Sequence, residues 1–287
     1  MKNLKKWLPY LMVLPVISIL LVVFISGISE ALLQSLGYFP FINMHSFTLK
    51  FYKEIFTEKD FINSLLFTLY IAFVSALFSV IMGLFLARIV SSFRLKNDYI
   101  FHIPIIIPQI TVALFAITLL SDTGLFARIF YFFGWDYKIF DNLVYSSNGS
   151  SIILAFLWKE IPYVMFSCLS IMKNNSFKYE KAAINLGACK FYAFRKVTLP
   201  MIINTVISTF TIVFSFAFGS YELYYLLGST KPKALAVKAL IEYNNPVMEN
   251  RPKAMAVNMV MIFFVVLFVI VFDYIIKRII LGKNYEK

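Results

Sequence analysis

The sequence predicts an all-α, polytopic membrane protein with six transmembrane helices. Of its 287 residues, 60% are apolar and only 15% are charged, and the mean hydropathy of +0.79 exceeds what a water-soluble domain can cover. A helix needs about 20 apolar residues to cross a hydrocarbon core of roughly 30 Å. The stretches that meet this requirement are 8–29, 62–87, 99–120, 151–172, 201–227 and 255–276. They are continuously apolar rather than alternating, which favours helices over a barrel.

The first apolar stretch predicts a retained helix rather than a secretory signal. Three lysines precede an apolar run from Leu8 to Phe24, which is longer than the roughly 7–15 residues of a signal core, and no small-x-small cleavage site follows Ile25. We therefore divide the chain into an N-terminal helix with its outer loop (1–61), a core of five helices (62–276) and a tail (277–287).

Charge predicts the orientation in the membrane. With the N-terminus inside, the inner segments hold sixteen basic residues against four acids, and the outer segments hold ten of each. This distribution follows the positive-inside bias, so we expect both termini in the cytoplasm. Because orientation and membrane lipid account for the net charge of +12, no nucleic-acid partner is expected.

Few residues suit catalysis, metal binding or a disulfide. Cys168 lies in the fourth predicted span and Cys189 in the loop after it, which leaves no plausible disulfide framework. The two histidines, His45 and His102, have no second ligand at metal spacing. The sequence also lacks a phosphate-binding loop. We therefore expect no metal, no cofactor and no enzymatic activity, and any ATP must be hydrolysed by another chain.

Prolines interrupt two of the predicted spans. Pro104 and Pro108 lie in the third and Pro162 in the fourth, and each removes a backbone donor and tends to kink a helix. Such kinks suit a transport pathway and suit plain packing equally well. The outer loop after the third span is aromatic and predicts a short interfacial helix over 125–133.

The segment 173–200, between the fourth and fifth spans, predicts two short cytoplasmic helices. Asn175 or Ser176 is placed to cap the first helix, and Gly187 supplies the turn after it. The apolar residues of the first helix recur at helical spacing, at Phe177, Ala182, Ala183 and Leu186. The second helix is expected over 190–197, and Pro200 marks the start of the fifth span.

One pattern in this segment resembles a known family. An alanine pair, a glycine and a Leu-Pro pair keep a fixed spacing, with thirteen positions from Gly187 to Pro200. The residues concerned are Glu180, Lys181, Ala182, Ala183, Leu186, Gly187, Ala188, Phe194, Leu199 and Pro200. They resemble the EAA loop of type I ABC importer permeases, and the likeness extends from Asn63-Ser64 to the sixth span.

The resemblance implies a function and a set of partners. In this family the loop docks on a separate ABC ATPase subunit and couples ATP hydrolysis to opening of the permease. The chain would pair with a second, homologous or identical permease subunit and receive solute from an extracytoplasmic solute-binding protein. The sequence departs from the family at Lys181, where the glutamate usually stands. Because Glu180 is one position earlier, it is rotated by about 100° on the helix, and either it takes over the acidic contact or the ATPase lacks the usual basic residue.

Ionisable and polar residues within the spans indicate where solute passes. Glu160 in the fourth span and Glu222 near the end of the fifth are expensive in lipid unless paired or wetted, so they are candidates for the pathway. Both have a structural alternative. Tyr163, Tyr221 and Asn258 could add polar contacts, although tyrosines near a membrane surface also act as interfacial anchors.

The transported solute is the weakest inference from the sequence. The form Leu186-Gly187-Ala188, with Tyr221-Glu222-Leu223 and the run 251–256, resembles the polyamine and aminoalkylphosphonate-type branch of the family. In contrast, five basic residues in the last outer loop favour an anionic ligand or an acidic binding protein.

Two other classes remain as alternatives. An ion-coupled secondary transporter should show paired repeats and discontinuous helices, and the sequence makes neither evident. An integral-membrane enzyme should show a cluster of catalytic side chains near one face, and the sequence shows none.

Overall fold

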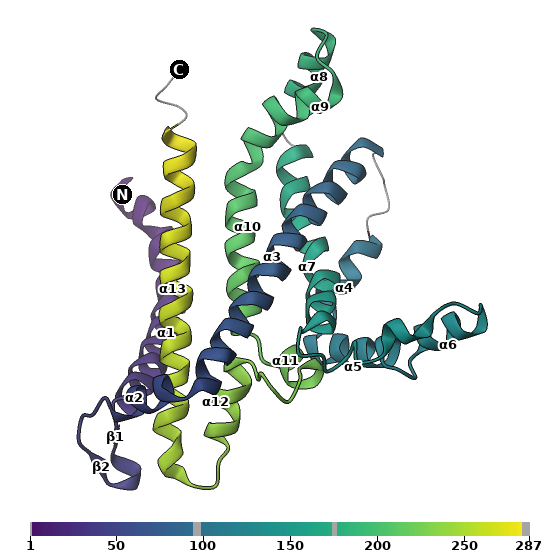
Figure 1. Ribbon diagram of the computed structural model, residues 1–287. Coiled ribbons are helices and arrows are strands. Elements are labelled where there is room, and N and C mark those ends of the chain that lie inside the picture. Colours follow the sequence, from purple (N-terminus) through teal and green to yellow (C-terminus); the bar gives the residue numbers. More distant parts are fainter. Residues whose placement is uncertain (1, 94–98, 174–176, 283–287) are drawn as a thin grey trace. The chain divides into compact units, whose positions relative to one another are not determined.

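The computed structural model describes residues 2–93, 99–173 and 177–282 (Figure 1). Within them, six helices are long and apolar enough to cross a membrane, as the sequence predicts. The proposed caps Asn175 and Ser176 lie outside the described residues. The chain divides into two compact units, 1–61 with 238–263 and 62–237 with 264–287.

The first unit contains the N-terminal helix and an ion-pair network. Its elements are α1 (Lys2–Ser35), an antiparallel pair β1 (Tyr38–Phe39) and β2 (Met44–His45) around the 3₁₀ turn η1 (Pro40–Ile42), α2 (Lys50–Thr57), most of α12 (Leu235–Tyr243), the turn η6 (Met248–Asn250) and the first part of α13 (Arg251–Gly282).

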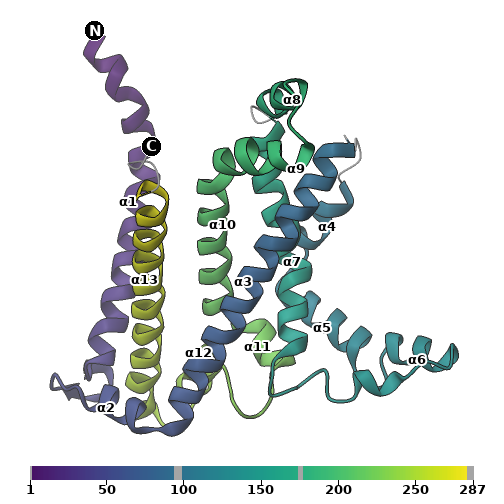
Figure 2. The same cartoon turned by 45° about the horizontal axis from the view of Figure 1, so that its top comes forward.

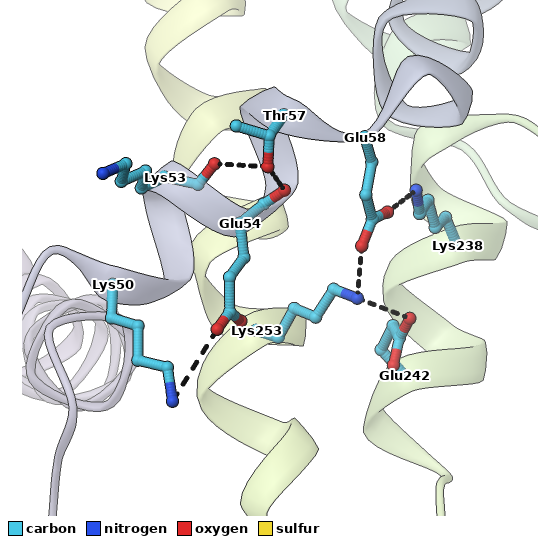
Figure 3. A network of polar contacts seen from close by, with 8 residues as sticks. All are labelled: Lys50, Lys53, Glu54, Thr57, Glu58, Lys238, Glu242 and Lys253. Atoms are coloured by element: carbon cyan, nitrogen blue, oxygen red, sulfur yellow. Dashed lines mark hydrogen bonds and ion pairs between the residues drawn. The ribbon is translucent and has the colours of Figure 1, made fainter.

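Glu58 is the centre of that network (Figure 3). Its carboxylate accepts hydrogen bonds from Lys238 at 2.6 Å and Lys253 at 2.7 Å, and Lys253 also pairs with Glu242 at 3.4 Å. Burial alone would raise the pKa of Glu58, but the two lysine hydrogen bonds outweigh it and hold the pKa below its usual value. The network thus ties the junction between α2 and α3 to α12 and α13.

The second unit contains most of the membrane helices. Its elements are α3 (Lys59–Phe93) from Ile62 onward, η2 (Tyr99–His102), α4 (Ile103–Ile106), α5 (Gln109–Leu120), α6 (Leu125–Phe132), η3 (Tyr137–Phe140), α7 (Ser150–Ile171), α8 (Phe177–Asn185), α9 (Lys190–Ala193), the π-helical turn η5 (Phe194–Thr198), α10 (Leu199–Gly219), α11 (Glu222–Leu227) and the end of α13.

Small residues let α3 approach α7 closely. A Cβ atom at Gly83 would lie 2.6 Å from Cβ of Val164 and 2.9 Å from the carbonyl oxygen of Ile161, so only glycine fits there. Ser75, Ser79 and Ala87 on α3 are also buried. Small residues at such spacing are typical of helix contacts within membranes.

Two predicted spans differ from the structure. The third, expected over 99–120, is interrupted because Ile107 and Pro108 are extended, with ψ of 130° and 148°. The expectation that no helix is discontinuous is therefore wrong. The fifth, expected over 201–227, ends as α10 at Gly219, and extended backbone at Ser220 leads into α11. Pro162, by contrast, lies inside an unbroken α7, and α6 forms where the interfacial helix is predicted.

Candidate functional site

The loop 173–200 contains the two predicted short helices at one end of the second unit (Figure 2). The first, α8, ends in a Schellman motif, in which the N–H of Ala188 donates to the carbonyl of Ala183 at 3.1 Å and the N–H of Gly187 donates to Ile184 at 2.9 Å. Gly187 has φ of +94°, a conformation that other residues rarely adopt. The predicted turn at Gly187 is therefore present in the structure.

The second short helix runs directly into the fifth span. α9 passes through the π-helical turn η5 into α10, and Pro200, which has no backbone N–H, lies just after that turn in α10. Among the residues of the family pattern here, Ala188, Phe194 and Leu199 are half-buried and Pro200 is exposed. The loop is thus a continuous helical extension of a membrane span.

Glu180 of α8 points inward, toward α3. Arg88 donates to both carboxylate oxygens, with Nη1 at 2.9 Å from Oε2 and Nη2 at 2.5 Å from Oε1. The hydroxyl of Thr198 donates to Oε2 at 2.5 Å, and the Arg88 guanidinium lies 5.0 Å from the centre of the Phe194 ring. Glu180 is only 3% exposed. Lys181, at the family's glutamate position, is exposed together with Ala182, and Ala183 is half-buried.

Apolar and aromatic side chains are exposed on the loop, beside exposed basic residues such as Lys178 and Lys190. Leu186 is 89% exposed and Phe191 72%, and the rings of Tyr179 and Tyr192 are also exposed. Sequence reasoning identified Leu186 but missed the three aromatic residues. Their signal was present, because large apolar side chains in so polar a segment have no membrane or core to enter.

The interrupted third span is stabilised by polar side chains from α7 and the end of α10. Lys159 Nζ donates to the carbonyl oxygen of Ile107 at 2.6 Å, where the break leaves that oxygen without a helical partner. Next to the break, the hydroxyl of Ser220 donates to Gln109 Oε1 at 2.9 Å, and the buried Nε2 of Gln109 has no partner. Irregular backbone at membrane depth requires such compensation.

The predicted pathway residues are not joined by side-chain interactions. Glu160 is buried and Tyr163 is half-buried on α7. Tyr221 is exposed and Glu222 half-buried where α11 begins. Asn258 belongs to the first unit. Within the described ranges, no hydrogen bond or ion pair connects any two of them.

Comparison with known proteins identifies the class. Residues 77–281 match the family of binding-protein-dependent transport system inner membrane components. The chain belongs to this family, and it is therefore a transport permease and not an enzyme. As its name states, such a component works in a transport system that depends on a binding protein.

Individual relatives are distant and differ in what they transport. The chain is 26% identical over 190 residues to the probable sulfate transport system permease protein cysT of Chlorella vulgaris, covering 64% of this chain and 68% of that one. It is 25% identical over 218 residues to the maltose/maltodextrin permease protein MalF of Vibrio cholerae, covering 73% of this chain. The chain spans 40% of that MalF and 60% of the sulfate permease CysT of Escherichia coli.

A solved structure shows the same fold. It is a bacterial ABC transporter involved in the import of the acidic polysaccharide alginate, with a TM-score of 0.75 and 20% identity, covering 97% of this chain and 98% of that chain. The predicted fold class is thereby confirmed. The resemblance to the polyamine and aminoalkylphosphonate-type branch finds no match among these proteins.

Proposed function

We propose that the chain is the permease subunit of an ATP-driven importer and that the loop 173–200 docks on a separate ABC ATPase. The exposed apolar surface of the loop carries the proposal. Side chains as exposed as Leu186 and Phe191 on a polar, water-facing loop favour a protein interface, since burying them removes apolar area from water. The Schellman turn and the continuation into α10 give that surface the rigidity that force transmission needs.

The remaining partners follow from the proposed class. A second permease subunit, homologous or identical, completes the translocation pathway, and an extracytoplasmic solute-binding protein delivers the solute. The excess of basic residues in 173–200 and in the tail supports a cytoplasmic position for the loop and for both termini. We propose that the assembly lies in a bacterial inner membrane, which the family's description as an inner membrane component supports.

We further propose that the pathway carries a small polar solute past Glu160, Tyr163, Tyr221, Glu222 and Asn258. Glu160 supports this best, because a buried acid without a hydrogen bond or ion pair in the described residues is costly in lipid and is retained where it has a role. A polyamine or an aminoalkylphosphonate remains the substrate proposal. The relatives are named for sulfate and maltose and the solved structure for alginate, so the solute class must be measured.

The docking surface is tested by making it polar. Leu186→Asp and Phe191→Asp should reduce co-purification of the ATPase at least tenfold, because either change buries an unpaired charge in the interface. Phe132→Asp is the matched control, since Phe132 is 83% exposed on α6, outside the loop. Equal ATPase recovery with all three variants would refute docking through this surface.

The solute is tested on the partner that binds it first. The solute-binding protein that co-purifies with this chain should be heated with spermidine, 2-aminoethylphosphonate, sulfate and maltodextrin in separate samples. A rise in melting temperature with spermidine or 2-aminoethylphosphonate supports the proposed branch, and a rise only with sulfate or maltodextrin contradicts it.

A further inference from the structure

We propose that Arg88 is a positioning residue that clamps the loop 173–200 to α3. In this proposal Glu180 is the residue of the loop that Arg88 holds, and it is not the loop's contact with the ATPase. The proposal rests on the proposed function only in taking the loop as the part that meets an ATPase. It assigns a task to α3, which the family pattern in 173–200 does not include.

Hydrogen bonds within the chain occupy both carboxylate oxygens of Glu180. A planar guanidinium that donates two hydrogen bonds to one carboxylate fixes the orientation of both groups, which a lysine cannot do. Oε1 receives Nη2 of Arg88, and Oε2 receives both Nη1 and the Thr198 hydroxyl. Since Glu180 is 3% exposed, its oxygens face away from any partner. The acidic contact that the family makes with its ATPase is therefore absent from this position.

The same cluster joins α3 to two elements of the loop. Arg88 belongs to α3, Glu180 to α8 and Thr198 to the turn that starts α10, and the Arg88 guanidinium also packs on Phe194. A displacement of α8 must then move the end of α3 with it. Without the clamp, α8 would remain attached to the second unit through its chain connections and the packing of its own short helices.

The clamp can be measured without knowing the solute. Because Cys168 is buried and Cys189 is exposed, a nitroxide spin label reacts with Cys189, two residues after the Schellman glycine. In the full chain, Arg88→Ala and Glu180→Ala should each increase the mobile fraction of the spin-label spectrum by roughly five- to tenfold, in the ordinary range of coupling between sites. The double variant should be no more mobile than Glu180→Ala alone, because removal of Glu180 already breaks both the Arg88 ion pair and the Thr198 hydrogen bond.

A matched control and a rescue separate positioning from general destabilisation. Lys50→Ala removes an exposed i,i+4 ion pair with Glu54 on α2 and should leave the spectrum unchanged. The exchanged pair Arg88→Glu with Glu180→Arg should recover part of the immobile fraction, which a merely weakened fold would not. An Arg88→Ala spectrum equal to that of Lys50→Ala, or additive effects in the double variant, would overturn the proposal.

If the Arg88→Ala variant fails to accumulate in the membrane, the Thr198→Val variant tests the clamp instead. It keeps the ion pair and removes one hydrogen bond, so a smaller increase in mobility supports the clamp and a wild-type spectrum contradicts it. Retention of the ATPase by the unsubstituted chain is measured separately. Its absence would reject the proposed function and leave the result on the clamp intact.

Discussion

Single residues determine how firmly the loop is held. The Arg88 and Glu180 pair illustrates what a sequence alone can reveal at this scale. The spacing of the alanine pair, Gly187 and Pro200 identified the loop, because these residues lie close together in the sequence. The partner of Glu180 lies 92 positions away, and no periodicity along the chain connects them. The departure at Lys181 was visible in the sequence, but the contacts of Glu180 required the fold.

Gly187 offers a direct test of the Schellman turn. Gly187→Ala should strain the loop by about 1–2 kcal/mol because φ is +94°, equivalent to roughly five- to thirtyfold in the opened population. Gly187→Val should cost more and Gly187→Asn less. A Cβ at this position meets nothing within 4 Å, so strain is the only cause.

The measurement is the rate of tryptic cleavage after the exposed Lys181. Gly27→Ala serves as the control, because that glycine is also free of neighbours within 4 Å but has no positive φ. Cleavage of Gly187→Ala at the control rate would show that the turn does not constrain the loop.

At the scale of elements, sequence periodicity located helices better than it located their interruptions. The fourth span was expected over 151–172 and is α7, Ser150–Ile171. The third span needed more information, because a proline can either kink a helix or end it. The helix is interrupted before Pro108, and Lys159, 52 positions from Ile107, supplies the donor that the Ile107 carbonyl lacks. α10 ends at Gly219, before Ser220, but the sequence remains apolar after these residues, so the predicted span extended too far.

Removing that donor should destabilise the second unit. Lys159→Met keeps the length of the stem but leaves the Ile107 carbonyl unpaired, which costs about 1–3 kcal/mol for a buried acceptor. We expect a lower melting temperature in detergent, with Lys159→Arg closer to the unsubstituted protein. Lys50→Met, at a lysine that is 70% exposed, is the control. Equal melting temperatures for Lys159→Met and Lys50→Met would show that the break needs no capping.

At the scale of the whole molecule, charge predicts the orientation. The two native cysteines test it, because Cys189 is exposed and Cys168 is buried. An impermeant maleimide should label Cys189 only after the membrane is opened, and Cys168 should stay unlabelled until the protein unfolds. Labelling of Cys189 in intact cells would place the loop outside and would also reject docking on a cytoplasmic ATPase.

We expect the close approach at Gly83 to act as a fulcrum for α3 within the second unit. Backbone packed this tightly against Val164 and Ile161 resists sliding, so we expect a rigid movement of α3 to be a tilt about this contact. At 1.5 Å per residue, the arm from Gly83 to Arg88 measures about 8 Å and the arm from Gly83 to Ile62 about 32 Å. A tilt about this fulcrum that moves Arg88 by about 1 Å therefore moves the opposite end of the lever by roughly 4 Å.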